Sequence, residues 1–440
     1  MKYDKFFQLA KQYGIEEAEI SVSESNSLSI QLFHGEIVNY SNNNATNIYA
    51  RGIINGKFGT AICDAWNNDK CEYLVKQIKE NALVIENDDP AIIFGGSPKY
   101  HKISTYNKDL ENVPTKTKID DLKRLEAEVR KADKRIIEVG SVGYQEQHQS
   151  FTILNSKGLK LTQKTNMFYA YADAVAQQGE QVKSGFDLFL NNDYSKFNVE
   201  ELAKSIAKKT CMQLGGEACE SGAYKTILSP EVTGTLLQAY IDHASSDDVQ
   251  KNSSLFIGKL GEKVASNKVT VIDAPLAKTV FARYFDDEGV ATSNKNVIKN
   301  GTLETYFYNL KTAAKGNTES TGNGFRGGTG IGCASAFLEL KAGKKSQEEL
   351  FQEIGNGVYI TDVSGLHAGL NPQSGNFSLQ STGFLIKDGK LDRGLDIITL
   401  SGNLMQLFKD IKEVGSDSQT LYTGVKAPSV FVKSLNVGGK

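Results

Sequence analysis

Tight turns at regular intervals constrain the first half of this chain more than any other feature of its sequence. His34-Gly35 and Asn55-Gly56 each lie between two stretches in which apolar and polar residues alternate. An Asn-Gly pair in this setting is the strongest short-range signal for a β-hairpin, because both turn residues adopt positive φ. Ser156-Lys157-Gly158 and Gly179 occupy similar places further along. Two pairs of successive hairpins are therefore predicted, one around the first two turns and one around the last two.

Helical periodicity brackets each pair of hairpins. A separate strand is also expected ahead of the hairpins, near 18–22 in the first case and near 136–143 in the second. The order helix, strand, hairpin, hairpin and helix thus occurs twice, which predicts an internal duplication of one α+β unit. The four helices are expected over residues 4–13, 68–83, 118–133 and 199–214.

The pattern changes after residue 221. Glycines become frequent, and short alternating stretches flank turns such as Asn300-Gly301 and Asp388-Gly389, which predicts an antiparallel sheet assembly of sandwich or barrel type. The predicted fold class is therefore α+β, with duplicated N-terminal α+β units followed by a β-rich antiparallel C-terminal domain. The predicted boundaries are 1–90 for the first unit, 91–115 for a linker, 116–221 for the second unit and 222–440 for the β-rich domain.

Composition excludes several classes of function. The 440 residues carry a net charge of −2 with no block of Lys and Arg, which argues against direct binding to nucleic acid. No apolar run reaches the roughly 20 residues of a membrane span, and the N-terminus is typical of an amphipathic helix, so a cytoplasmic protein is expected. The five cysteines have no CxxC spacing, which favours buried free thiols.

The stretch 229–252 has the strongest helix start signal in the chain. Ser229 is placed to cap the helix, Pro230 suits its first position and Glu231 lies near its positive end. His243 falls beside the apolar face, where a partly buried, hydrogen-bonded histidine is a better interpretation than a metal ligand. The apolar face consists of Val232, Leu236, Leu237, Tyr240, Ile241 and Ala244.

Three other features invite a functional interpretation. The glycine-rich segment 321–332 lacks the GK[ST] ending of a phosphate loop and is expected to be a loop between strands. Asp286-Asp287-Glu288, together with Asp247-Asp248, could supply carboxylates to a hard metal, but acids ahead of a glycine are typical of solvated turns. His367 lies in a glycine-rich loop, where a functional role is more plausible than for His34, His101 or His148.

Six segments of the sequence are distinctive: SPEVTGTLL, KNSSLFIGKLGEKVAS, FDDEGVATSNKNVIKNGTLETYFYN, STGNG at Ser320 to Gly324, GNFSLQSTGFLIKDGKL and the terminal VFVKSLNVGG. Together they resemble the TldD/PmbA family, which has been described both as modulators of DNA gyrase and as cytoplasmic metalloproteases. The resemblance spans most of the chain in order and is dense from Gly222 onward. It implies duplicated N-terminal α+β units ahead of a β-rich domain, as predicted above.

Catalytic TldD-type members carry HExxxH on the helix that here begins at Ser229. The two histidines bind zinc, the glutamate is the general base and a cysteine near the C-terminus is a further ligand. In this chain Gln238 and Ala239 replace the first two residues, His243 matches the last, and no cysteine follows Cys333. The resemblance therefore implies a TldE (PmbA)-type subunit with no catalytic residue and no bound metal. A TldD-type partner is expected to hold the zinc.

The resemblance further implies a cytoplasmic TldD/TldE metalloprotease that degrades or processes unfolded peptides. This chain would form part of a homo- or hetero-oligomer and contribute chamber wall, without contact to nucleic acid or membrane. His367, Asn376 and Phe377 are the candidate substrate-binding residues. Two alternatives stay open: an independent metallopeptidase with a non-standard site built from His243, Cys333 and His367, and a non-enzymatic, gyrase-modulating interaction protein.

Overall fold

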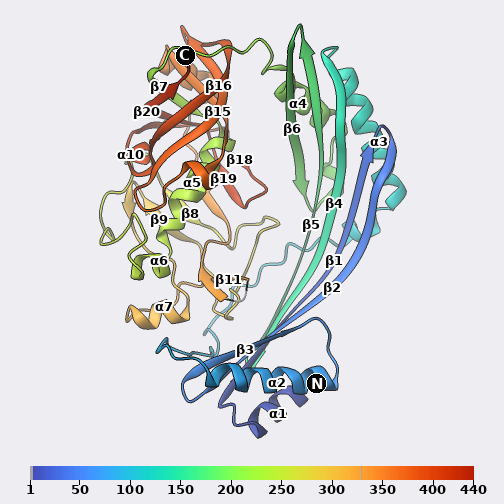
Figure 1. Ribbon diagram of the computed structural model, residues 1–440, viewed down its shortest axis with the longest axis vertical. Helices are drawn as coiled ribbons and strands as arrows, with labels where there is room; N and C mark the ends of the chain where they lie inside the picture. Colours follow the sequence, from blue (N-terminus) through green and yellow to red (C-terminus); the bar gives the residue numbers. More distant parts are fainter. Residues whose placement is uncertain (1–2, 329) are drawn as a thin grey trace.

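The protein consists of a long curved sheet and a second, β-rich half that lies along the inner side of the curve (Figure 1). A computed structural model describes residues 3–328 and 330–440. The sheet belongs to the first half of the chain, and the residues after 221 form the other half. The structure thus confirms a mixed α+β protein with an antiparallel N-terminal sheet and a β-rich C-terminal region.

Six antiparallel strands form the N-terminal sheet in the order β3-β2-β1-β4-β5-β6. Pairing of β1 with β4 joins two three-stranded meanders at the centre of the sheet. The predicted turns are confirmed, because His34 and Asn55 have φ values of 51° and 50° and are each followed by a glycine of positive φ. The strands are β1 (Glu17–Phe33), β2 (Glu36–Ile54), β3 (Lys57–Cys63), β4 (Ile136–Asn155), β5 (Lys160–Gln178) and β6 (Gln181–Asn191).

The strands are longer than the sequence predicts. The separate strands expected near 18–22 and 136–143 are wrong, since each is the start of one continuous strand. Polar segments such as 24–27 in β1 and 42–47 in β2 have low intrinsic strand propensity and resemble loops. In the sheet they pair with each other in unbroken register, so cross-strand pairing overrides local propensity.

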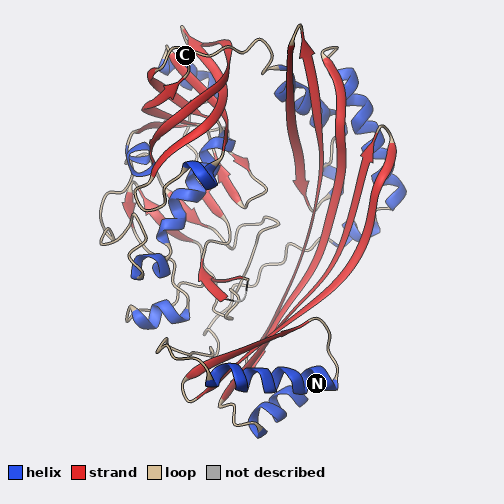
Figure 2. Ribbon diagram, in the orientation of Figure 1, coloured by secondary structure: helices blue, strands red, loops and turns tan. Residues whose placement is uncertain are grey.

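Helices cover one face of this sheet (Figure 2). One pair packs against β1 and β2 near the N-terminus, and the other pair packs against β1, β4 and β5 at the far end. No helix among the described residues is both long and apolar enough to cross a membrane. The helices are α1 (Asp4–Gln12), α2 (Asn68–Leu83), α3 (Thr115–Ala132) and α4 (Val199–Cys211), with short 3-10 turns η1 (Lys108–Asn112) and η2 (Tyr194–Lys196).

Two further six-stranded sheets build the C-terminal half. One has the order β10-β9-β8-β13-β19-β18, and the other has the order β16-β15-β14-β7-β20-β17 and closes on itself through β16 and β20. The first consists of β8 (Val271–Asp273), β9 (Lys295–Lys299), β10 (Thr302–Leu303), β13 (Leu338–Leu340), β18 (Gln419–Thr420) and β19 (Val425–Ala427). The second consists of β7 (Gly222–Leu228), β14 (Gly357–Ser364), β15 (Asn376–Lys387), β16 (Lys390–Asn403), β17 (Ile411–Val414) and β20 (Val430–Gly438).

The helix predicted over 229–252 is interrupted. Its first part is helical, but Ser245 adopts an extended ψ of 117° and its hydroxyl accepts a hydrogen bond from the backbone N–H of Asp248 at 3.4 Å. A serine that caps a new helix in this way competes with continuation of the old one. The segments are α5 (Pro230–Ile241), the 3-10 turn η3 (Asp242–Ala244) and α6 (Ser246–Gln250).

One other local prediction differs from the structure. The glycine-rich segment 321–332 contains a hairpin of β11 (Gly324–Gly327) and β12 (Gly330–Cys333) rather than a plain loop. Strand β17 follows α10 directly and pairs with β20. The remaining helices are α7 (Leu310–Lys315), α8 (Gln347–Ile354), α9 (Leu366–Gly369) and α10 (Leu404–Lys409). All five cysteines are free, and four of them are buried.

The acidic segment Asp286-Asp287-Glu288 is buried, so its prediction as a solvated turn is wrong. The two carboxylate oxygens of Asp286 accept hydrogen bonds from the backbone N–H groups of Glu288, Val290 and Gly324 at 2.9–3.0 Å. Buried carboxylates are tolerated when such donors replace water. The segment is therefore a structural loop at the boundary between the two halves.

A buried ion network joins the two halves through this loop. Arg51 on β2 donates from Nε to Oε1 of Glu19 on β1 at 2.6 Å, and its Nη1 lies 3.6 Å from Oε1 of Glu288. The three side chains are at most 6% exposed. Removal of one member of a buried network leaves uncompensated charge, so the sheet and the C-terminal half depend on each other here.

Replacement of Arg51 with alanine is expected to lower the free energy of unfolding by about 3–5 kcal/mol, because two carboxylates remain buried without their cation. Urea unfolding followed by circular dichroism measures the change. Lys116→Ala is the control, since Lys116 pairs with Asp120 on an exposed helix surface and such pairs contribute about 1 kcal/mol or less. Equal losses in the two variants would contradict the assigned role of Arg51.

Candidate functional site

Helix α5 is held rigidly at its start. The Ser229 hydroxyl accepts a hydrogen bond from the backbone N–H of Val232 at 3.2 Å, and Pro230 occupies the first turn, as predicted. Tyr240 stacks on Phe408 with ring centroids 4.3 Å apart and donates a hydrogen bond to the carbonyl oxygen of Val264. Most of the helix is buried in the C-terminal core, so its side chains have defined positions.

The three residues that the resemblance places at the HExxxH positions all make local contacts. Gln238 is half-buried and donates from Nε2 to Oδ1 of Asp242 at 2.6 Å. Ala239 is half-buried and packs against the C-terminal core. His243 lies beyond the end of α5 in the turn η3, where it is 7% exposed.

The His243 ring is oriented by the protein itself. Its Nδ1 accepts a hydrogen bond from the backbone N–H of Leu255 at 3.3 Å, and the edge of the Phe256 ring lies against it. Burial lowers the pKa of His243 below its usual value of 6.5, although the nearby Asp248 carboxylate opposes the shift. A neutral histidine with its Nδ1 already occupied is suited to packing.

These residues do not fit a catalytic zinc ion. Such an ion needs three protein ligands and a general base, whereas this helix offers one imidazole, an amide and a methyl group. Cys333 has hydroxyl neighbours, since its Sγ lies 3.4 Å from the hydroxyl oxygens of Ser246 and Thr312. Across residues 3–328 and 330–440, no three or more His, Cys, Asp or Glu side chains are grouped so that they could hold a metal.

The candidate substrate-binding residues lie on a different surface. His367 is exposed on the short helix α9. Asn376 and Phe377, at the start of β15, help to line a shallow depression of about 540 Å³ whose rim includes Ala368, the neighbour of His367. Oδ1 of Asn376 accepts a hydrogen bond from Asn403, and Phe377 is buried. These residues are close together but include no acid–base pair.

The inner face of the N-terminal sheet is a further candidate surface, which sequence reasoning missed. Every second residue of β1 from Ser23 to Ser29 is a serine, and the register sets Ser27 opposite Asn43 on β2 and Gln147 on β4. We call this surface the polar face. It consists of Ser23, Ser25, Ser27, Ser29, Asn39, Ser41, Asn43, Asn47, Gln145, Gln147 and Gln149, all of which are exposed or half-buried.

The chemistry of the polar face is uniform. Hydroxyl and amide side chains both donate and accept hydrogen bonds, and none carries a charge at neutral pH. The alternate residues of β1, such as Leu28 and Ile30, lie in the core beneath the helices. The polar face can therefore bind backbone amides of an extended peptide without selecting its side chains. The period-2 run of serines in β1 was the available signal in the sequence.

An aromatic strip borders the polar face on β5 and β6. Tyr169 and Tyr171 have ring centroids 6.1 Å apart, and Phe186 lies 5.8 Å from Tyr171. The Tyr169 hydroxyl donates to Gln145 of the polar face, and the Phe186 side chain is half exposed. Exposed rings beside uncharged polar groups offer apolar contact for peptide side chains.

Replacement of His243 with glutamine is expected to reduce the loss of unfolding free energy that occurs as the pH falls below 6.5. Because the folded pKa of His243 is lowered, the unfolded chain takes up a proton first as pH falls through 6.5, and the wild type then loses stability. The difference between wild type and variant should change by up to about 1.4 kcal/mol per pH unit below pH 6.5. Urea unfolding at pH 7.5, 6.5 and 5.5 measures it.

His101→Gln is the control for this series, because His101 is exposed and lies in the connecting segment. It should leave the pH profile unchanged. Parallel profiles for wild type and the His243 variant would contradict the burial-induced lowering of the His243 pKa.

Comparison with known proteins identifies the family. The profile of the PmbA/TldA metallopeptidase central domain matches residues 108–214, and that of the C-terminal domain matches residues 221–439. A metalloprotease from Methanothermobacter thermautotrophicus is 26% identical, over 97% of this chain and 96% of its own length.

Two solved structures share the fold over the whole chain. A Thermotoga maritima protein that carries the name of a DNA gyrase modulator has a TM-score of 0.93 and 33% identity, with 99% of each chain covered. TldE from Thermococcus kodakarensis has a TM-score of 0.92 and 24% identity, with 100% of each chain covered. This chain belongs to the PmbA/TldD metallopeptidase family.

Proposed function

We propose that this chain is a TldE-type subunit of a two-component TldD/TldE metallopeptidase. It holds no catalytic zinc, it assembles with a TldD-type subunit that does, and together the two degrade or process unfolded peptides. The observation that carries the proposal is the sequence of helix α5. This capped and largely buried helix has Gln238 and Ala239 at the positions of the first zinc ligand and the general base.

The contacts of these residues support a subunit without its own metal centre. Gln238 is hydrogen-bonded to Asp242, and His243 accepts a backbone N–H through Nδ1. Ala239 cannot accept the proton of a metal-bound water, which a peptidase of this kind requires. An independent metallopeptidase would need a replacement set of ligands and a base, and residues 3–328 and 330–440 contain no cluster of three or more His, Cys, Asp or Glu side chains that could hold a metal.

The polar face supports the contribution of this chain to a peptide chamber. It is broad, uncharged and bordered by aromatic rings, which suits unfolded chains of varied sequence. The C-terminal half lies along its inner side (Figure 2), and a partner subunit would complete the enclosure. We also infer that the two meanders of the sheet arose by duplication of one α+β unit and that the protein acts in the cytoplasm.

A direct contact with DNA gyrase or DNA is not part of the proposal. The name of the Thermotoga maritima structure suggests a gyrase connection for that protein. In this chain the net charge of −2 and the lack of a basic block disfavour contact with DNA phosphates.

The purified chain is expected to contain well under one zinc per molecule and to leave an unfolded peptide uncut. Elemental analysis by mass spectrometry measures the zinc, and chromatography of a casein digest measures the cleavage. The TldD-type subunit of the same organism, treated identically, is the positive control. Stoichiometric zinc together with cleavage by this chain alone would overturn the proposal.

A negative charge on the polar face is expected to impair the assembled peptidase. Gln147→Glu introduces a charge beside the serines of β1 and should reduce kcat/KM for an acidic unfolded peptide about threefold to tenfold by repulsion. Thr162→Glu is the matched control, because Thr162 is exposed and points to the opposite side of the sheet from Gln163 of the inner face. Equal activities of the two variants would argue against a peptide path along the polar face.

A further inference from the structure

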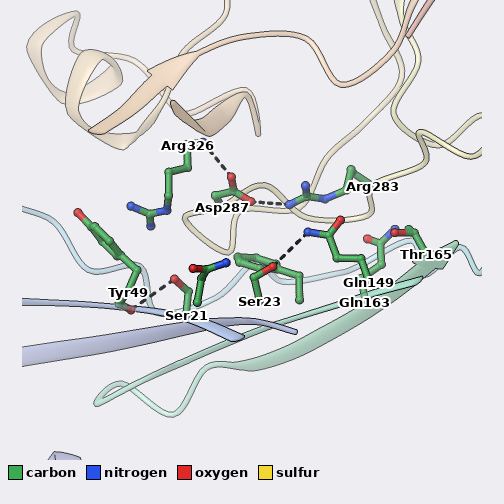
Figure 3. A pocket seen from close by; sticks show the side chains of 11 residues that line it. Ser21, Ser23, Tyr49, Gln149, Gln163, Thr165, Arg283, Asp287 and Arg326 are labelled. Atoms are coloured by element: carbon green, nitrogen blue, oxygen red, sulfur yellow. Dashed lines mark hydrogen bonds and ion pairs between the residues drawn. The ribbon is translucent and has the colours of Figure 1, made fainter. Parts of the chain in front are cut away.

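A cleft of about 220 Å³ lies where the polar face meets the C-terminal half (Figure 3). Its floor is formed by alternate residues of β1, β2, β4 and β5, including Ser23 and Gln149 of the polar face. Its roof is formed by Arg283, Asp287 and Arg326, which approach from the acidic loop and from β11. The two halves of the chain thus build this cleft together.

Arg326 is held in place without a partner for its charge. Its backbone N–H donates to Oδ2 of Asp287 at 2.8 Å, and its guanidinium carbon lies 3.3 Å from the centre of the Tyr49 ring. Nη1 and Nη2 are both buried, and neither has a hydrogen-bond partner among the described residues. Buried donors without acceptors are costly, and a water, an ion or a ligand that accepts from them removes that cost.

The side chains that line the cleft have a net charge of +1, because two arginines face one aspartate. Asp287 is the single carboxylate in its lining, and its Oδ1 is already 2.5 Å from Nη2 of Arg283. Arg283 lies over the rings of Phe151 and Phe325, and its Nε has no partner among the described residues. An arginine fork that is fixed by aromatic stacking presents parallel N–H groups, the geometry that binds an oxyanion through two bonds.

We propose that this cleft binds the carboxylate of a peptide whose chain lies along the polar face. Arg326 makes the primary contact, and Arg283 adds a second N–H donor through Nε. The inference rests on the proposed function, since it names the group by which an unfolded peptide is anchored. The carboxylate belongs either to the C-terminus of the peptide or to an Asp or Glu side chain within it.

Two observations favour a peptide carboxylate over a nucleic acid or a free phosphate. The cleft continues into the uncharged hydroxyl and amide groups of the polar face, which match peptide backbone rather than further phosphates. Its lining carries two arginines and one aspartate, a net charge of +1, which matches a single carboxylate rather than the repeated phosphates of a nucleic acid.

The test uses peptides with and without a carboxylate. The probes are dansyl-Gly-Ser-Ala-Gly-Ser-Ala as free acid, the same peptide as C-terminal amide, and the amide with one Ala replaced by Glu. Fluorescence titration of the full chain gives each Kd. We expect at least one of the two carboxylate peptides to bind about 10- to 100-fold more tightly than the neutral amide. The free acid and the Glu peptide distinguish the two sources of the carboxylate.

Arg326→Met supplies the matching protein variant. It should weaken binding of the preferred carboxylate peptide by about 10- to 100-fold and leave the neutral amide unchanged. Because the Arg326 side chain satisfies no acceptor in the free protein, the variant should melt at the same temperature as the wild type or higher. Lys164→Met is the control, since it removes one positive charge from an exposed position on the same strand as Thr165 of the cleft.

Three results would overturn the inference. The first is equal binding of the carboxylate and amide peptides. The second is a lower melting temperature of Arg326→Met without a change in peptide affinity. The third is displacement of the peptide by inorganic phosphate at concentrations far below those of acetate. Failure of this kind is separable from failure of the proposed function, because binding to the isolated chain requires neither zinc nor partner. Zinc content and dependence on the partner would still test the proposed function.

Discussion

The alternation of side chains across the N-terminal sheet is the constraint on which the rest of the structure depends. A slip of one residue in any pair of strands would exchange the two faces. The register that buries Leu28 and Ile30 beneath α3 and α4 also places Ser27 and Ser29 on the opposite side. The apolar core and the polar face are thus two consequences of one set of backbone hydrogen bonds.

The C-terminal half is positioned against that sheet by buried charge. Arg51 and Glu19 lie on adjacent strands, and Glu288 reaches them from the acidic loop. The same loop carries Asp287, which binds both Arg283 and the backbone of Arg326. The network that joins the halves therefore also shapes the cleft between them. Buried ion networks seldom add net stability, whereas the loss of one member is strongly destabilising.

Sequence reasoning predicted the features that depend on local chemistry. The turns at His34-Gly35 and Asn55-Gly56, the cap at Ser229 and the α+β class follow from short-range rules, and the structure confirms them. Features that depend on distant partners were not predictable. The polar segment 24–27 is a strand because β2 and β4 flank it, and Glu288 is buried because Arg51 lies opposite.

The candidate site shows the same division between local and distant chemistry. The loss of the HExxxH residues can be read directly at Gln238 and Ala239. The polar face needs the register of strands that are far apart in the chain. The unpaired guanidinium of Arg326 can be recognised only once burial and neighbours are known. Family resemblance therefore indicated which residues this helix lacks, whereas the structure was needed to find the polar face and the cleft.

The central claim is that this chain takes part in peptide hydrolysis without performing the chemistry. The most direct measurement combines it with a TldD-type subunit of the same organism, in one case intact and in the other with the glutamate of HExxxH changed to glutamine. Cleavage of an unfolded peptide is followed for each mixture. The account predicts activity that requires both this chain and the intact glutamate of the partner. Cleavage that persists with the substituted partner, or that is unchanged when this chain is left out, would contradict it.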